Sequence, residues 1–326
     1  MPGKVVIFTT GGTIATRVDP VTGKAVPAVS GAELLEAVPP LGALCPVELR
    51  EFSTIASPAM TPARMLLLAG AVEEALAGED CLGAVITHGT DTLEETAYLL
   101  DLYVTGEKPV CITGSMRTGE DLSADGPKNI LDAVRVAMSR DARGKGVLVV
   151  LNEAVHAARE VMKTHSGKVE TFQSPFWGPL GYADEDRVIF RRAPLGMQKI
   201  RPAKMEGDVH IVALAAGSDD LFLNFLVEKG AAGIVLQAFG RGNVPPAVVP
   251  GIRRALEAGI PVVMTTRCPG GRVLGVYGYE GGGRDLLDMG VISAGELTSH
   301  KARIKLMLAL GETRDMKQLG VFFDTP

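Results

Sequence analysis

Residues 5–13 read VVIFTTGGT, an apolar run followed at once by a glycine pair and a threonine. Residues 83–92, GAVITHGTDT, have the same form and end in a second glycine–threonine turn. Glycine lets the backbone bend sharply and approach a ligand closely. Because ligands in open α/β sheets collect at the carboxyl ends of the strands, the two turns predict one shared pocket with hydroxyl groups, and an enzyme is the leading interpretation.

Apolar runs of this kind recur along the chain and alternate with helical segments. The alternation predicts an α/β fold with two doubly wound domains, a larger N-terminal one with a mainly parallel sheet and a smaller C-terminal one with a parallel sheet. The strands are expected at residues 5–9, 82–87, 109–113, 147–151, 210–215, 233–238 and 261–265.

The boundary between the two domains is predicted where the pattern is lost. Proline, glycine and charged residues without an apolar face predict a linker at residues 193–208, between an N-terminal catalytic domain, 1–192, and a C-terminal domain, 209–326. Thr61-Pro62 predicts the start of a helix over residues 63–76, and Thr92 with Glu95 has the spacing of a capping box. An amphipathic helix at residues 296–310 is expected to close the chain.

Composition narrows the class of protein. The 326 residues carry 33 basic and 38 acidic side chains, for a net charge of −5, without a basic block that would neutralise nucleic-acid phosphates. The start runs directly into a strand pattern, and no apolar run approaches the roughly 20 residues that span a bilayer. We therefore expect a cytoplasmic protein without a nucleic-acid or membrane partner. The four scattered cysteines are expected to be buried free thiols.

Four polar residues can carry chemistry. Thr13 follows a strand, so its hydroxyl can act as a nucleophile if a base activates it; alternatively it caps the next segment. Thr90 and Asp91 place a hydroxyl beside a carboxylate, although Asp91 also suits the first turn of a helix. Lys163 follows the strand at 147–151 and can act as a base through a threonine hydroxyl in a desolvated pocket, whereas most lysines are simply solvated.

Metal and nucleotide sites have little support. The five histidines lack the short spacing of metal ligands, and His88 is expected to form hydrogen bonds inside the fold. The glycine pair lacks the Gly-x-Gly-x-x-Gly spacing, and the chain has no Gly-Lys-Ser/Thr phosphate loop. We expect no metal and no cofactor.

Taken together, several segments resemble the bacterial-type L-asparaginase family, the threonine amidohydrolases that include glutaminase-asparaginases. The resemblance covers essentially the whole chain, and the paired TGGT and HGTDT motifs are its most specific part. The matching segments are TTGGTIA (9–15), ITHGTDTLEETAYLLDL (86–102), SADGPKN (123–129), KTHSGKVETFQSP (163–175), GRGNVP (240–245) and KARIKLMLAL (301–310).

The resemblance implies an activity and roles for individual residues. It implies a cofactor-independent hydrolysis of L-asparagine to L-aspartate and ammonia through an acyl-enzyme on Thr13. Thr90, Asp91 and Lys163 would form a second catalytic group, in which the lysine and the aspartate polarise the threonine hydroxyl. Ser57 would bind the α-carboxylate of the substrate, and Asp91 its α-ammonium. The remaining substrate contacts would come from Gly12, Gly89 and Ser115, and backbone N–H groups around Thr90 would stabilise the oxyanion.

The same resemblance implies an oligomer and shows two departures. Family members form tetramers built as dimers of dimers, and Asn243 and Glu280 align with residues that complete the site of a neighbouring subunit. A tyrosine near the nucleophile is replaced here by Ala25, and a polar residue beside Ser57 by Pro58. These departures keep open two alternatives: an amidase for glutamine or another small amide, and an amino-acid-binding homologue without turnover. A subunit that feeds ammonia to a tRNA-charging partner is a further alternative, less favoured than the amidase.

Overall fold

We describe the protein from a computed structural model, which describes residues 3–19, 22–27 and 29–324. The chain divides into two compact units, Met1–Lys199 and Ile200–Pro326, referred to below as the N-terminal and C-terminal units. The linker bounds predicted at residues 193–208 stay a prediction.

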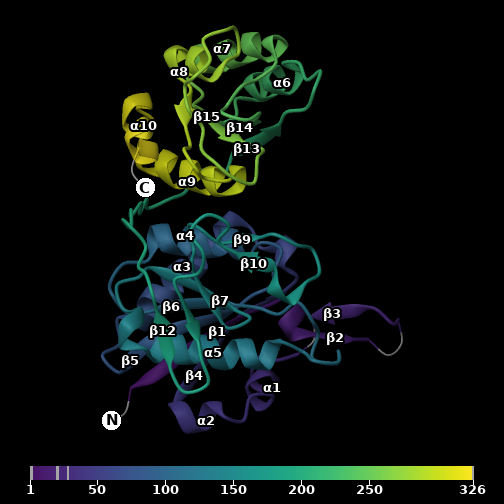
Figure 1. Ribbon diagram of the computed structural model, residues 1–326, viewed down its shortest axis with the longest axis vertical. Coiled ribbons are helices and arrows are strands. Elements are labelled where there is room, and N and C mark those ends of the chain that lie inside the picture. The colour runs from purple at the N-terminus through teal and green to yellow at the C-terminus, as the bar shows by residue number, and fades with distance from the viewer. Residues whose placement is uncertain (1–2, 20–21, 28, 325–326) are drawn as a thin grey trace. The chain divides into compact units, whose positions relative to one another are not determined.

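An eight-stranded sheet forms the centre of the N-terminal unit (Figure 1). Its strand order is β12-β11-β8-β7-β6-β5-β1-β4. The strands from β7 to β4 pair in parallel, whereas β8, β11 and β12 form an antiparallel edge. The bounds are β1 Lys4–Gly11, β4 Val47–Ile55, β5 Cys81–Thr87, β6 Val110–Thr113, β7 Val147–Leu151, β8 Ala154–Ala157, β11 Gly181–Ala183 and β12 Val188–Phe190.

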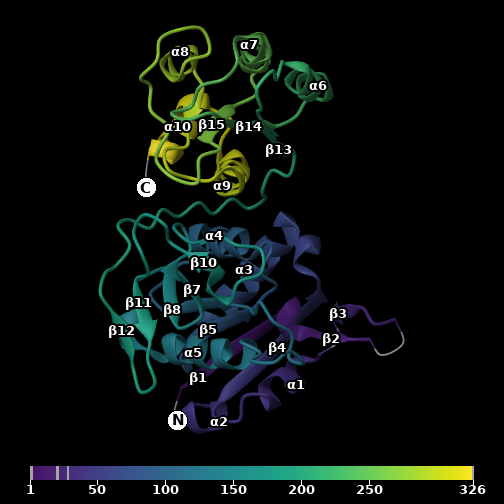
Figure 2. The same ribbon diagram turned by 45° about the vertical axis from the view of Figure 1, so that its right-hand side comes forward.

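Helices cover both faces of this sheet. Figure 2 shows α3 and α4 on one face and α5, with α1 and α2, on the other. Two short hairpins, β2–β3 and β9–β10, extend from the sheet. The remaining bounds are α1 Gly31–Glu36, α2 Leu41–Leu44, α3 Pro62–Leu76, α4 Leu93–Tyr103, α5 Gly126–Met138, β2 Thr16–Val18, β3 Ala25–Pro27, β9 Met162–Lys163 and β10 Phe172–Gln173, with 3-10 turns η1 Thr13–Ala15, η2 Ser57–Ala59, η3 Arg140–Ala142 and η4 Val169–Thr171.

Both predicted helix starts are confirmed, but only the first has the side-chain cap that its sequence suggests. The Thr61 side chain accepts a hydrogen bond from Arg64 N and Pro62 opens α3, which confirms that start. The capping box at Thr92 is wrong, because its side chain forms no cap to α4. Instead, Thr92 Oγ1 donates to the carbonyl oxygen of Ser57 at 2.8 Å, so a contact between distant segments competes with the local cap.

The C-terminal unit holds a smaller parallel sheet, in the order β13-β14-β15-β16. With the mainly parallel sheet of the N-terminal unit, it confirms the predicted fold class. The bounds are β13 Val209–Ala213, β14 Gly233–Ala238, β15 Val262–Thr266, β16 Ile292–Ser293, α6 Leu221–Lys229, η5 Pro246–Val248, α7 Val249–Glu257, α8 Gly283–Met289, α9 Ser299–Glu312 and α10 Met316–Asp324.

The expected amphipathic helix near the C-terminus needs correction. The helix α9 begins at Ser299 and is buried on nearly all sides, so that even Lys301 and Lys305 are 1% exposed. It packs against β13, β14 and β15, and α10 follows it. The Lys305 ammonium lies over the ring of Phe323 in α10, 5.3 Å from the ring centroid, which helps a charged side chain to remain inside.

The cysteines follow the expectation from composition with one exception. Cys45, Cys81 and Cys111 are free and buried, whereas Cys268 is free but exposed, contrary to prediction. None of the helices within the described residues combines the length and apolar content needed to cross a bilayer.

Candidate active site

The two glycine–threonine turns touch each other through their backbones. A Cβ atom on Gly12 would lie 2.2 Å from Gly89 Cα, and one on Gly89 would lie 2.7 Å from Ser57 Cβ. Gly12 also has φ 85°, a value that side chains disfavour. Since β1 and β5 are neighbouring parallel strands, their carboxyl ends bring the turns together, and only glycine fits at this contact.

Lys163 connects the second turn to a hairpin from a distant part of the chain. Its Nζ lies 2.9 Å from Thr90 Oγ1 and 2.7 Å from Asp91 Oδ1. The lysine side chain is 16% exposed and that of Asp91 is 58% exposed, so the pair has a buried cationic end and an open anionic end. The backbone N–H of Lys163 donates to Glu94 Oε1 at 3.3 Å, which ties β9 to the first turn of α4.

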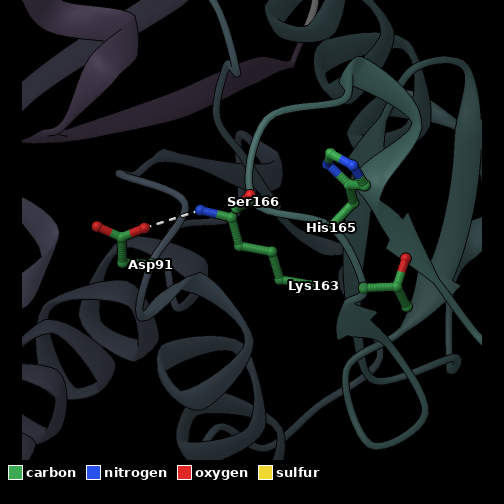
Figure 3. Close-up of a pocket in the computed structure, with 5 residues that line it drawn as sticks. Asp91, Lys163, His165 and Ser166 are labelled. Atoms are coloured by element: carbon green, nitrogen blue, oxygen red, sulfur yellow. Dashed lines mark hydrogen bonds and ion pairs between the residues drawn. The ribbon is translucent and has the colours of Figure 1, made fainter.

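These three side chains can activate a hydroxyl group. Loss of a proton from Thr90 leaves a negative oxygen that an ammonium 2.9 Å away stabilises, and Asp91 holds that ammonium in place. Figure 3 shows the Lys163 side chain reaching across to Asp91. An open pocket of about 350 Å³ adjoins the pair and is lined by Asp91, Lys163, Thr164, His165 and Ser166. In Figure 3 the His165 ring points away from the ion pair.

Ser57 lies beside this group on the 3-10 turn η2, which follows β4. The backbone N–H of Asp91 donates to Ser57 Oγ at 3.2 Å, and the Ser57 carbonyl accepts from Thr92. The Ser57 side chain is therefore held against the turn that bears Thr90. Pro58, the next residue, is exposed and offers no hydrogen-bonding side chain.

Thr13 is the first residue of η1 and is partly buried. The carbonyl oxygen of Gly12 accepts from Ala15 N at 2.9 Å and from Thr16 Oγ1 at 2.8 Å, so the peptide that precedes Thr13 is fixed. Contact between Gly12 and Gly89 then places Thr13 next to the turn that bears Thr90. Ala25 lies on β3, where it pairs with Val18 of β2, on the hairpin that follows η1.

Ser115 is fully buried in the loop after β6, and its Oγ donates to the carbonyl oxygen of Arg117 at 2.8 Å. The carboxylate of Asp125 accepts from the N–H groups of Met116 and Arg117 at 3.0 and 2.9 Å. Asn129 Nδ2 donates to the carbonyl oxygen of Gly114 at 2.9 Å. Asp125 and Asn129 thus position this loop. Sequence reasoning assigned them no role, although both lie in the segment SADGPKN.

His88 forms hydrogen bonds inside the fold, as predicted. Its Nδ1 lies 2.6 Å from the Gly89 carbonyl oxygen, and its Nε2 lies 3.0 Å from Thr96 Oγ1. Burial lowers the pKa of His88 to about 4, so the ring is neutral at pH 7. The described residues contain no group of three histidine, cysteine, aspartate or glutamate side chains arranged to hold a metal ion.

Asn243 and Glu280 lie on adjacent loops of the C-terminal unit. Asn243 Oδ1 accepts from Gly283 N at 3.0 Å, and Val244 N donates to the Gly281 carbonyl oxygen at 2.8 Å. The Glu280 side chain is exposed. The two loops therefore form one surface of this unit. Asn243 and Glu280 must lie on a common surface if they act together.

Comparisons with known proteins cover almost the whole chain. The family model "Asparaginase, N-terminal" matches residues 4–196, and "Glutaminase/Asparaginase C-terminal domain" matches residues 208–323. An L-asparaginase of Bacillus licheniformis is 38% identical over 97% of this chain and 98% of its own length. A glutaminase-asparaginase of Pseudomonas fluorescens biotype A is 37% identical over 98% and 89%. A probable periplasmic L-asparaginase of Haemophilus influenzae is 37% identical over 98% and 92%.

Proposed function

The chain belongs to the asparaginase family, and from this premise we propose that it hydrolyses the side-chain amide of L-asparagine to L-aspartate and ammonia. The observation that carries the proposal is the hydrogen-bonded group of Thr90, Lys163 and Asp91 beside the contact of Gly12 with Gly89. The relative that spans nearly the whole chain at 38% identity is an L-asparaginase, which supports asparagine as the substrate.

Thr13 acts as the nucleophile in this proposal. Its oxygen attacks the amide carbon, its proton passes to the leaving nitrogen, and ammonia departs to leave an aspartyl ester on Thr13. Backbone N–H groups of the two turns stabilise the oxyanion that forms in this step. Splitting one difficult displacement into two easier steps is the advantage of a covalent intermediate.

Thr90, Lys163 and Asp91 act in the second half of the reaction. Water attacks the carbonyl carbon of the aspartyl ester, and its proton passes through the Thr90 hydroxyl group, which Lys163 holds, to the departing Thr13 oxygen. The ester bond breaks, aspartate is released, and the Thr13 hydroxyl group is restored. Asp91 has two roles, because Oδ1 holds Lys163 while the exposed carboxylate can also bind the α-ammonium of the substrate. Ser57 binds the α-carboxylate, and Ser115 borders the amide.

Ammonia release from asparagine tests the proposal. Thr13→Ala and Lys163→Met are each expected to lose activity by at least a hundredfold. Lys168→Met is the matched control, since Lys168 is an exposed lysine on the same hairpin. Activity in both site variants that equals that of the control would exclude the mechanism.

Glutamine is the second candidate substrate. A relative named glutaminase-asparaginase is 37% identical over 98% of this chain, and Pro58 offers no polar side chain beside Ser57. We expect kcat/KM to be higher for asparagine than for glutamine, because Pro58 provides no polar contact that could position a longer substrate. Measurement of kcat/KM for both amides decides between them.

The proposal extends to assembly and location. We place Asn243 and Glu280 in the site of a neighbouring subunit, within a homotetramer built as a dimer of dimers. We place the protein in the cytoplasm, where the four free thiols would stay reduced. Light scattering tests the tetramer, and cell fractionation tests the cytoplasmic location. A periplasmic location, as the name of the Haemophilus influenzae relative states for that protein, is the competing outcome.

A further inference from the structure

We propose that His88 is a positioning residue for amide hydrolysis, because its ring holds and polarises the peptide group that presents the Thr90 N–H to the oxyanion. The inference rests on the proposed function and deepens it. It assigns a task to a fully buried histidine whose two ring nitrogens bond to Gly89 and Thr96. Two hydrogen bonds of the ring and the geometry of one peptide group carry it.

The first step is the tautomer of His88. The carbonyl oxygen of Gly89 can only accept, so the proton of the hydrogen bond at 2.6 Å must be carried by Nδ1. The other ring nitrogen, Nε2, is then an acceptor, and the Thr96 hydroxyl group donates to it at 3.0 Å. Burial keeps the ring neutral, which makes this arrangement the stable one at pH 7.

The second step is the peptide group between Gly89 and Thr90. A trans peptide group is planar, with its C=O and N–H pointing in opposite directions. When His88 holds the Gly89 carbonyl oxygen on one side, the Thr90 N–H is aimed at the other side. The ring of His88 therefore sets the direction of this N–H without touching it.

The third step is the state of that N–H group. Thr90 is 5% exposed, yet within the described residues its backbone N–H has no recorded acceptor in the protein. Buried backbone donors are nearly always paired. A buried donor that is left open and held in one direction is the form expected of an oxyanion contact.

The ring itself is well anchored. The backbone N–H of His88 donates to the Thr113 carbonyl oxygen of β6 at 2.8 Å, while Thr96 lies on α4. Gly114, after β6, closes the space from another side, because a Cβ there would lie 2.5 Å from the His88 carbonyl oxygen. The strand β6 and the loop after it therefore fix the His88 backbone, while Gly89 and Thr96 bind the two ring nitrogens.

Polarisation adds to this geometric effect. A hydrogen bond to a carbonyl oxygen strengthens the N–H of the same peptide as a donor, by about 10–30% in condensed phases. Removing an oxyanion donor entirely costs about 10²–10³ in kcat. Removing only its support should cost less, about 10- to 100-fold in kcat. KM should change little, because the interaction strengthens in the transition state.

Three substitutions separate the two ring nitrogens. His88→Asn keeps a donor near the position of Nδ1, His88→Gln places its amide near Nε2, and His88→Leu removes both. With asparagine as the substrate, we expect His88→Asn to retain kcat within about threefold of the wild type. The other two should lose about 10- to 100-fold in kcat, with KM unchanged within about threefold. Folding is checked by the melting temperature and by aspartate binding.

Several outcomes would overturn the inference. A folded His88→Leu protein with kcat within threefold of the wild type would do so. Equal losses of kcat in His88→Asn and His88→Leu would also overturn it, as would a change in KM instead of kcat. A wild type that releases no ammonia from any amide would instead contradict the proposed function itself.

Thr96→Val decides the question if His88→Leu does not fold. This change removes the hydroxyl group that donates to Nε2 and helps to hold the ring, and we expect kcat to fall about three- to tenfold. Thr265→Val is the matched control, because Thr265 is equally buried and donates to the Leu236 carbonyl oxygen in the C-terminal unit. Equal kcat in the two threonine variants would overturn the inference.

Discussion

At the scale of single residues, the ammonium group of Lys163 determines what the site can do. It lies within hydrogen-bonding distance of a hydroxyl group and a carboxylate that are 73 and 72 residues away in the chain. Sequence patterns alone could not distinguish it from other lysines, because nothing local marks a long-range contact. Only the resemblance of the segment KTHSGKVETFQSP identified it before the structure.

The first residue-scale prediction concerns the negative charge of Asp91. Asp91→Asn keeps the size of the side chain but removes the charge that holds the Lys163 ammonium at 2.7 Å. We expect kcat for asparagine to fall about 10²-fold and KM to rise, since the α-ammonium of the substrate loses its partner. Steady-state ammonia release measures both. Asp186→Asn, at an exposed ion pair with Arg187, should leave both constants unchanged, and an active Asp91→Asn enzyme would contradict this role.

The second residue-scale prediction concerns the close contact between Gly12 and Gly89. In Gly12→Ala, a methyl group would meet the Gly89 backbone at 2.2 Å while the residue keeps a positive φ, so we expect several kcal/mol of destabilisation and loss of activity. Gly70→Ala is the control: Gly70 lies within the helix α3 with open space around it, and alanine should stabilise the protein by about 1 kcal/mol. Denaturant unfolding measures both free energies. Equal stability of the two variants would contradict the close approach.

At the scale of elements, burial explains which segments the sequence predicted. The buried strands that lead to the site were predicted because they are short apolar runs. The edge strand β4 was missed, because it alternates polar and apolar residues and stays half-buried. The helix α9 was misread as amphipathic, because Lys301 and Lys305 look like surface residues in sequence but are enclosed by the packing of the C-terminal unit. No local pattern reports that enclosure.

Two buried histidines give an element-scale prediction about pH. Burial lowers the pKa of His88, after β5, and of His156, in β8, from 6.5 to about 4. The unfolded chain therefore binds protons first as pH falls, so the stabilising effect of keeping these rings neutral is complete above pH 6.5 and is lost between pH 6.5 and 4. Each ring should contribute roughly 3 kcal/mol across that range.

His156→Asn isolates one of these contributions. His156 Nδ1 lies 2.9 Å from Ser174 Oγ, just beyond the β9–β10 hairpin that bears Lys163, and asparagine can keep a polar contact there. The free energy of unfolding of the variant should depend less steeply on pH between 6.5 and 4 than that of the wild type. Urea unfolding at a series of pH values measures the slopes, and equal slopes would show that His156 does not titrate in this range.

At the scale of the whole molecule, the chain has two units, each built around its own parallel sheet. The sequence predicted this division because the alternation of strands and helices stops once and then resumes. It could not predict whether neighbouring subunits share a site, because contacts between chains leave no periodic pattern in the sequence. Asn243 and Glu280 were singled out by resemblance alone.

A mixing experiment tests the shared site at this scale. Thr13→Ala removes the nucleophile from the N-terminal unit, and Asn243→Ala alters the loop tied to Gly283 in the C-terminal unit. If Thr13 and Asn243 of one site come from different subunits, a mixed pair of the two inactive proteins contains one intact site. Co-assembly should then restore about a quarter to a half of the wild-type activity. Unmixed variants are the controls. No recovery after verified co-assembly would place both residues in a site of one chain.

The most direct test of the central claim is to trap the covalent intermediate. The wild-type protein is mixed with L-asparagine, quenched in acid during turnover, digested and analysed by mass spectrometry, with Thr13→Ala treated in parallel. We predict an aspartyl ester on the peptide that contains Thr13, and none in the variant. An ester on Thr90 instead, or ammonia release without any ester on Thr13, would contradict the account.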